Sequence, residues 1–375
     1  MFTSPVKNEK VKAVTKGNRC PCVILMLAIV VSLAGCSLNN AGAPAQQPVN
    51  PRHSTYDLCI SERDFYIGVV PTPRTVPAAT FDDITAAYEE AGDIAEVAMV
   101  WVTPSGIGQY DKLKQNNVIT AFRVYGVRPV VTLGFATIRQ VPEEGLKYVV
   151  DAPAGVNADL SDPQFRRLWV DEARKIAGDF KPEYFSLGNE INDYFYLHPD
   201  ELNDYVSLYD EAFAAIKEAS PDTKVFVVFS YEHLIENGQY DLLALFDSRA
   251  DMIGLTTYPW NQYDAPQDMP DDYYRRIEKY TGKPIAFTEI GWISSAEKGS
   301  SEKEQAEFLT RFLQLTRGSD IEMVSWLFLH ETSFSGESAA VFQPEAGTIA
   351  LKHADGSKKE IYDVWLDLKD LKIVR

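Results

Sequence analysis

Two glutamates stand at the ends of short apolar segments of this sequence. Glu190 closes the run 185–190 (FSLGNE), and Glu289 closes the run 285–289 (IAFTE). A carboxyl group at the end of a buried strand emerges beside the core, where partial desolvation can tune its pKa. Two carboxyl groups about 5 to 5.5 Å apart suit hydrolysis of a glycosidic bond with retained configuration, one as proton donor and the other as nucleophile. The alternative is that each glutamate forms a structural ion pair at its strand end.

An alternation of strands and helices along most of the chain would position both glutamates. Apolar segments of strand length alternate with amphipathic segments, which is typical of βαβ units and a parallel sheet. We expect strands at residues 65–71, 95–102, 128–135, 184–190, 225–230, 252–258, 285–289 and 323–329. The pattern predicts an α/β fold with a single (β/α)8 TIM barrel and puts both glutamates at the C-terminal ends of its strands, where barrel active sites lie. A doubly wound open sheet remains the alternative, because one miscounted strand would open the barrel.

Helix boundaries are marked by capping residues. Start signals occur at Thr80 with Asp83, Asp162 with Pro163, and Ser301 with Glu304. Gly318 predicts a helix end. Trp169 and Trp365 lie on apolar helix stripes, so we expect both in the core. The longest non-periodic stretches, at 136–161 and 330–350, follow strands three and eight and would lie at the catalytic face.

The order of short motifs around the two glutamates resembles clan A of the glycoside hydrolases. That clan has Asn-Glu at the end of strand four and Glu at the end of strand seven, and residues 188–190 (GNE) and 288–292 (TEIGW) match these positions. The resemblance implies Glu190 as general acid/base, Glu289 as nucleophile and Asn189 as ligand of the sugar 2-hydroxyl. It covers residues 65 to 368, including a closing segment at 347–358.

Two aromatic residues gain a role from the same resemblance. It implies that Tyr258, after strand six, hydrogen-bonds the nucleophile and that Trp326, on strand eight, forms the floor of a sugar subsite. Within the clan, residues 100–104 (VWVTP) resemble the strand-two motif of the endo-β-1,4-galactanase family. That family carries an arginine on strand two near the nucleophile, which this strand lacks, and Arg74 after strand one is the candidate substitute. The missing arginine leaves open a barrel that binds glycans without cleaving them.

Other side chains at predicted strand ends are candidate sugar ligands. Trp101, Trp260 and Trp292 could stack their flat faces on sugars, with packing at the barrel rim as the alternative. Tyr231, beside Glu232 after strand five, and His330, after strand eight, could donate or accept hydrogen bonds.

The N-terminal region has the pattern of an exported lipoprotein. Basic residues between positions 7 and 19 precede an apolar run at 23–34, which is too short to span a bilayer comfortably and is typical of a secretory signal. Residues 33–36 (LAGC) resemble the bacterial lipobox, which implies lipidation of Cys36. We expect a signal peptide at 1–35, a lipid-anchored flexible linker at 36–58 and the catalytic domain at 59–375. The destination would be the cell envelope, at the outer membrane or cell surface. An ordinary signal peptide or a signal anchor, with Cys36 incidental, is the alternative.

Composition and motifs argue against several other functions. The net charge of −18 argues against nucleic acid as partner. Five histidines without HxH or HExxH spacing give no signal of a metal site, and no phosphate-binding glycine loop, dinucleotide fingerprint or GxSxG is found. We therefore expect a monomer that uses no cofactor or metal, with a carbohydrate substrate. A lyase or isomerase using the same carboxylates remains a further alternative.

Overall fold

The computed structural model describes residues 52–74, 79–102, 118–141, 145–334 and 343–375. The predicted signal peptide, Cys36, most of the predicted linker and part of the galactanase-like motif after strand two lie outside the described residues. Of the described helices, none has the length and apolar character needed to cross a membrane.

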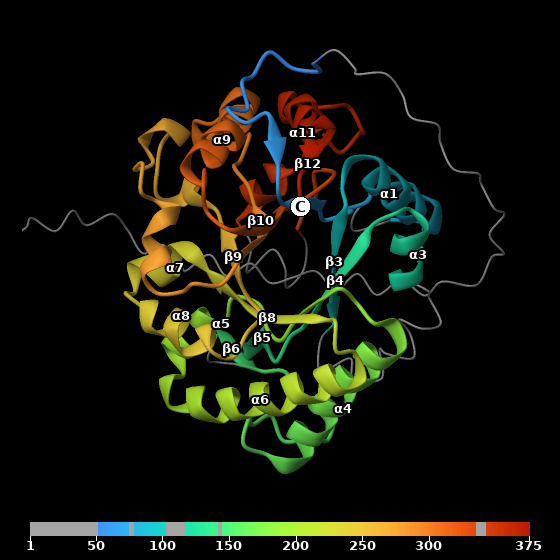
Figure 1. Ribbon diagram of the computed structural model, residues 1–375, viewed down its shortest axis with the longest axis vertical. Helices are drawn as coiled ribbons and strands as arrows, with labels where there is room; N and C mark the ends of the chain where they lie inside the picture. Colours follow the sequence, from blue (N-terminus) through green and yellow to red (C-terminus); the bar gives the residue numbers. More distant parts are fainter. Residues whose placement is uncertain (1–51, 75–78, 103–117, 142–144, 335–342) are drawn as a thin grey trace, which may run out of the picture.

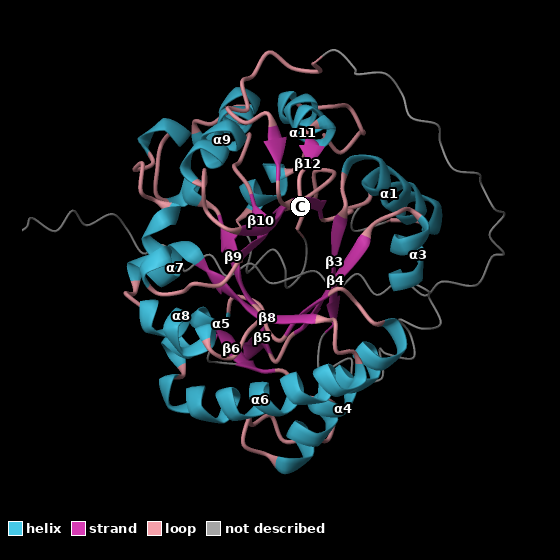
Figure 2. Cartoon of the chain, viewed as in Figure 1, coloured by secondary structure: helices cyan, strands magenta, loops and turns pink. Residues whose placement is uncertain are grey.

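Parallel strands close into a barrel in the middle of the molecule (Figures 1 and 2). In chain order they are β2 (Tyr66–Val69), β3 (Val97–Val102), β4 (Arg128–Leu133), β7 (Tyr184–Ser186), β8 (Lys224–Ser230), β9 (Met252–Thr257), β10 (Ile285–Ile290) and β11 (Ile321–Trp326). Each expected strand has its counterpart, so the predicted TIM barrel is confirmed and the open-sheet alternative is wrong. β11 pairs with β2 and closes the ring. Several strands are buried along their whole length, which explains their continuous apolar sequences.

Helices surround the barrel (Figure 2). The longer ones are α1 (Phe81–Ile94), α4 (Pro163–Phe180), α6 (Leu202–Ala219), α8 (Tyr240–Asp247), α9 (Glu302–Leu315) and α11 (Glu360–Asp370), and the shorter ones are α3 (Val118–Val124), α5 (Ile191–Leu197) and α7 (Tyr231–Glu236). Short 3-10 turns lie at Pro199–Glu201, Pro259–Asn261, Pro266–Asp268, Tyr274–Lys279, Ala296–Lys298 and Pro344–Ile349. Trp169 and Trp365 are both fully buried between helix and barrel, as their positions on apolar stripes predicted.

The predicted helix starts are confirmed. Thr80 and Asp83 form a reciprocal capping box, and the Asp162 side chain accepts from two backbone N–H groups directly before Pro163. Ser301 accepts from the Glu304 backbone N–H at 3.2 Å. Because these caps satisfy N–H groups that have no partner inside the helix, they fix where each helix begins and how it faces the barrel.

Two small sheets lie outside the barrel. An antiparallel hairpin of β5 (Ala136–Val141) and β6 (Gly145–Val150) rises from the C-terminal end of β4, within a stretch where the sequence showed no periodicity. β1 (Glu62–Arg63) pairs with β12 (Lys372–Ile373). Contacts of the domain begin before the predicted boundary at residue 59, since the Ser54 hydroxyl donates to Asp367 of α11 at 2.5 Å.

Candidate active site

Glu190 stands on a tight turn between β7 and α5. Gly188 has φ +122°, and a side chain there would meet the Ile191 Cγ2 atom at 2.7 Å, so this position needs glycine. Glu190 itself adopts a left-handed conformation (φ 48°), which is uncommon for a residue with a side chain. The turn leaves the Glu190 carboxyl group almost fully buried, with its Oε1 accepting from the Thr256 hydroxyl at 2.6 Å.

Glu289 lies on β10 and is fully buried. Its Oε2 accepts a hydrogen bond from the Tyr258 hydroxyl at 2.5 Å, while Oε1 is buried and has no hydrogen-bond partner in the described part of the chain. Burial raises the pKa of Glu289 from its ordinary 4.5 to about 7, although the hydrogen bond from Tyr258 acts in the opposite direction. Near neutral pH this carboxyl group is therefore divided between its charged and neutral forms.

Strand β9 brings the two glutamates together. Thr256, which binds Glu190, is also the register partner of Glu289 on β10, and Tyr258 follows two residues later. Burial raises the pKa of the Tyr258 hydroxyl well above its usual value, and the charges of Glu289 and Glu190 raise it further. Both carboxyl groups therefore lie within electrostatic reach of one hydroxyl group.

A third buried carboxylate holds this tyrosine in place. Glu232 accepts from the Tyr258 backbone N–H at 2.9 Å, from the Thr257 hydroxyl at 2.6 Å and from the Tyr273 hydroxyl at 3.0 Å. Burial raises the pKa of Glu232, and these hydrogen bonds partly offset that rise. With both oxygens engaged, Glu232 serves as a positioning residue for Tyr258 and not as a sugar ligand.

Several buried polar atoms near the C-terminal ends of the strands lack hydrogen-bond partners among the described residues. These atoms are Trp101 Nε1, Asn189 Oδ1, Trp260 Nε1 and Glu289 Oε1, on or after β3, β7, β9 and β10. Such orphaned groups are rare in folded proteins, and each calls for an explanation. A hydroxyl-rich ligand at this face would satisfy donors and acceptors alike. Asn189, Trp101 and Trp260 thus keep their predicted roles as candidate sugar ligands, and Tyr258 lies where the resemblance implied.

Two tryptophans that were predicted to contact the sugar, Trp292 and Trp326, pack against helices instead. Trp292 is buried against Phe308 of α9, with ring centroids 5.5 Å apart, and its Nε1 donates to Ser300. Trp326 is buried against Trp365 of α11 at 6.1 Å, and its Nε1 donates to a backbone carbonyl. Both rings face the surrounding helices, so their predicted role in the sugar subsite is not supported. Trp292 follows a register shift between Phe287 and Ile290 of β10, and such a bulge re-aims side chains.

Three further predicted ligands also point away from the glutamates. The Tyr231 hydroxyl donates to the Tyr273 carbonyl and is fully buried. His330 bonds the Thr72 carbonyl through Nδ1 at 2.8 Å and lies 3.6 Å from Glu90 of α1, and burial lowers its pKa. Arg74 is exposed, and its guanidinium covers Gly356. Arg74 therefore does not replace the missing strand-two arginine beside Glu289.

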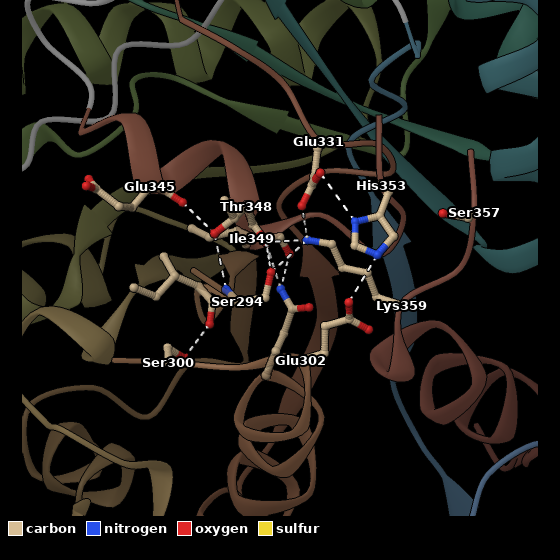
Figure 3. Close-up of polar contacts among 12 residues, drawn as sticks. Ser294, Ser300, Glu302, Glu331, Glu345, Thr348, Ile349, His353, Ser357 and Lys359 are labelled. Carbon is tan, nitrogen blue, oxygen red and sulfur yellow. Dashed lines mark hydrogen bonds and ion pairs between the residues drawn. The ribbon is translucent and has the colours of Figure 1, made fainter. Parts of the chain in front are cut away.

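A buried lysine, Lys359, connects the loops that follow β10 and β11 through hydrogen bonds and an ion pair (Figure 3). Lys359 Nζ donates to the Thr348 carbonyl at 2.7 Å and to the Ser294 hydroxyl at 2.9 Å, and it pairs with Glu331 at 2.6 Å. His353 lies between Glu331 and Glu302 in the same cluster. Burial lowers the pKa of Lys359, against the opposing effect of Glu331. The cluster joins the closing segment to the loops on the Glu289 side of the barrel.

In the part of the chain that the structure describes, no group of three or more His, Cys, Asp or Glu side chains is arranged to hold a metal ion.

Comparisons with known proteins point to glycoside hydrolases. Residues 175–350 match the model of glycosyl hydrolase family 53. This segment begins within α4, ends within the closing segment at residue 350, and contains Glu190, Tyr258 and Glu289. The chain is a TIM-barrel glycosidase. Its segment 175–350 is similar to family 53, and the motifs around the two glutamates in that segment had indicated clan A.

Solved structures share the glycosidase fold at low sequence identity. The exo-β-1,4-mannosidase Op5Man5 from Opitutaceae bacterium strain TAV5 is 14% identical, with a TM-score of 0.63 over 87% of this chain and 63% of that chain. The glycosidase therefore spans less than two thirds of that mannosidase. GH5_18 from Streptomyces cattleya, in complex with GlcNAc, is 14% identical over 82% and 80% with a TM-score of 0.62. Xylanase 10B from Thermotoga maritima is 14% identical over 82% and 95% with a TM-score of 0.55. No curated protein matches the chain significantly.

Proposed function

We propose that this glycosidase hydrolyses β-linked oligo- or polysaccharides with retention of configuration, using Glu190 as general acid/base and Glu289 as nucleophile. One observation carries the proposal: two buried carboxyl groups, at the ends of β7 and β10, are both hydrogen-bonded to side chains at the end of β9. A shared strand end brings them to the same part of the barrel mouth, as a double-displacement mechanism requires.

Each step assigns a task to one carboxyl group. Glu190, protonated, gives its proton to the glycosidic oxygen while Glu289 attacks the anomeric carbon, so the leaving sugar departs and a glycosyl-enzyme ester forms. Tyr258 occupies Oε2 of Glu289, which leaves Oε1 as the attacking oxygen. In the second step the Glu190 carboxylate removes a proton from water. That water attacks the anomeric carbon and releases Glu289, so both glutamates return to their starting states.

The absence of a strand-two arginine has an electrostatic consequence. A neighbouring guanidinium would favour the charged form of Glu289 and lower its pKa. Here only the Tyr258 hydroxyl opposes desolvation, and the pKa stays at about 7. Activity should therefore increase as the pH passes through neutrality, until Glu190 loses the proton it must donate.

The comparisons support a β-glycan substrate without identifying the sugar. Residues 100–104 resemble a motif of the endo-β-1,4-galactanase family, part of the chain matches glycosyl hydrolase family 53, and the similar structures carry the names exo-β-1,4-mannosidase and xylanase. The rival function is a barrel that binds glycans without cleaving them, which the missing arginine favours. Two buried carboxyl groups linked through one strand end favour the enzyme.

We further propose that the protein is an exported monomer held in the cell envelope by lipid on Cys36. The support is the lipobox-like sequence after a basic and apolar leader. Cys36→Ala should release the protein from the membrane fraction or leave its precursor unprocessed. A processed Cys36→Ala protein that stays with the membrane would contradict the lipid anchor.

A substrate panel with product analysis tests the enzymatic proposal. Purified protein is incubated with β-1,4-linked galactan, mannan, xylan and glucan, and proton NMR follows the anomer released first. We expect hydrolysis of at least one glycan with the β-anomer as first product. Release of the α-anomer would exclude the retaining mechanism. Binding of a glycan without hydrolysis would favour the rival.

A further inference from the structure

Helix α5 and the β5–β6 hairpin form one unit beside Glu190. They follow the C-terminal ends of the neighbouring strands β7 and β4 and lie side by side (Figure 1). The Tyr148 ring packs edge-on against Tyr194 at 5.3 Å, and the His198 ring bonds the Tyr148 carbonyl at 2.8 Å. Since α5 starts directly after Glu190 and runs away from it, this α5–hairpin unit (residues 136–141, 145–150 and 191–198) extends from the proposed proton donor.

Asp193, in the first turn of α5, is a buried acceptor with one free oxygen. Its side chain is 4% exposed, and Oδ1 is held by His233 Nδ1 at 2.8 Å. Oδ2 is buried without a hydrogen-bond partner among the described residues. Leaving such an oxygen unsatisfied costs about 1 to 3 kcal/mol, and more when it is charged. A ligand group that donates a hydrogen bond to Oδ2 would remove this cost.

Asp193 belongs to the surroundings of Glu190, since its backbone N–H donates to the Glu190 carbonyl at 3.0 Å. Burial is the main cause that raises the pKa of the Tyr148 hydroxyl, and the charges of Asp193 and then Glu190 raise it further. One hydroxyl on the hairpin thus lies near both carboxyl groups. Asp193 is not part of the mechanism above, and its His233 partner satisfies only one of its oxygens.

Exposed apolar side chains concentrate at the far end of the same unit. In the described residues the exposed large hydrophobic side chains are Val124, Leu146, Tyr196, Leu197 and Tyr280. Three of these, Leu146 on β6 with Tyr196 and Leu197 on α5, belong to the α5–hairpin unit. Tyr196 is 59% exposed, stands three residues after Asp193 and so shares a side of the helix with it. At the helical rise it lies about 9 Å beyond Glu190 along the axis.

We infer that Asp193 and Tyr196 form a binding site for the leaving-group side of a β-linked sugar chain. Asp193 Oδ2 accepts a hydroxyl of the sugar next to the scissile bond, and the Tyr196 ring stacks on a sugar further along. This rests on the proposed function, because it takes Glu190 as the residue that protonates the leaving oxygen. The sugar bonded to that oxygen must then lie beside Glu190, where α5 begins. The site is suited to chains with at least two sugars beyond the bond that is cleaved.

Comparing substrates with and without a leaving sugar tests this inference. The probes are the 4-nitrophenyl β-glycoside and the β-1,4-linked pentasaccharide of whichever sugar (galactose, mannose, xylose or glucose) the wild type hydrolyses. Asp193→Asn should lower kcat/KM for the pentasaccharide at least tenfold, the loss of a hydrogen bond to a charged group. Tyr196→Ala should lower it about fivefold, as for a lost ring contact. Both variants should lose less than about threefold on the aryl glycoside, whose leaving group carries no sugar.

Tyr280→Ala is the matched control, since Tyr280 is an exposed tyrosine that stacks on Tyr240 and is not part of the α5–hairpin unit. Tyr280→Ala should leave kcat/KM unchanged for both the pentasaccharide and the aryl glycoside. Tyr196→Ala should also shift the cleavage of end-labelled pentasaccharide away from bonds that leave two sugars on the departing side.

Three outcomes would overturn the inference. Equal losses on both substrates for Asp193→Asn would mean that the aspartate only supports the fold through His233. Tyr196→Ala with the rates and cleavage pattern of Tyr280→Ala would remove the stacking site, and because Tyr196 is exposed this variant tests the site without endangering folding. A wild type inactive on the aryl glycosides and pentasaccharides of all four sugars would instead overturn the proposed function itself, and the inference with it.

Discussion

Replacing Tyr258 by phenylalanine removes the hydrogen bond that Glu289 accepts and keeps the ring. A hydrogen bond to a charged group is worth about 1.5 to 3 kcal/mol, and each pKa step corresponds to about 1.4 kcal/mol. The Glu289 pKa, already at about 7, should therefore increase to about 8 or 9. At pH 7 the charged fraction of Glu289 falls from about one half to between about one tenth and one hundredth.

The pH dependence of kcat/KM on a dinitrophenyl β-glycoside measures this change. Such a leaving group departs without a proton from Glu190, so the acidic limb reports the ionisation of Glu289 in the free enzyme. The wild-type limb should lie near pH 7. In Tyr258→Phe the limb should move to about pH 8 or 9, with a loss of about 5- to 50-fold at pH 7 that is largely recovered at pH 9.

Tyr184→Phe provides the control. Tyr184 donates an equally short 2.5 Å hydrogen bond to a buried glutamate, Glu322, but at the start of β7, at the other end of the barrel. Removal of this hydrogen bond should not shift the acidic limb of the pH dependence of kcat/KM. If Tyr258→Phe has the same acidic limb as the wild type, Tyr258 does not control the charge of Glu289, and the electrostatic reasoning fails.

Three other predictions concern stability. Because the folded pKa of Glu289 lies above its unfolded value of 4.5, wild-type stability falls as the pH rises from 4.5 through 7, so Glu289→Gln should gain about 2 to 3 kcal/mol over wild type between pH 5 and 8. If urea unfolding gave the same difference in free energy of unfolding between Glu289→Gln and wild type at pH 5 and at pH 8, this prediction would be contradicted. Lys359→Met removes the partner of Glu331 and should cost about 2 to 4 kcal/mol, against less than about 0.5 kcal/mol for exposed Lys303→Met. Gly188→Ala should lower the thermal midpoint and abolish activity, and retained activity would show that the turn is adaptable.

Much of the barrel could be predicted because its strands are buried on both sides and therefore appear as continuous apolar runs. The same runs put Glu190 and Glu289 at strand ends, and the helix caps gave the helix starts. The hairpin β5–β6 escaped prediction, since a half-exposed pair of short strands has a weaker pattern.

The direction of side chains at strand ends could not be predicted from the sequence either. Spacing did not show that Trp292 and Trp326 face the helices, because a position at a strand end does not say whether the side chain points to the barrel mouth or to the helices, and a register shift in β10 precedes Trp292. Nor could it show that His330 turns to Glu90 of α1, a contact between residues 240 positions apart. Thr256 and Asp193 were missed, although their positions two residues before Tyr258 and three after Glu190 could have suggested them.

The stereochemistry of azide rescue tests the roles of the two glutamates most directly. Glu289→Ala removes the nucleophile, so wild-type turnover should be lost, and azide that takes its place should give a glycosyl azide of inverted, α configuration. Glu190→Ala should still form the glycosyl-enzyme from a dinitrophenyl β-glycoside, and azide should release it as the β-glycosyl azide. These two opposite products are what the assignment predicts. A β product from Glu289→Ala together with an α product from Glu190→Ala would reverse the roles, and no rescue of either variant would contradict the double displacement.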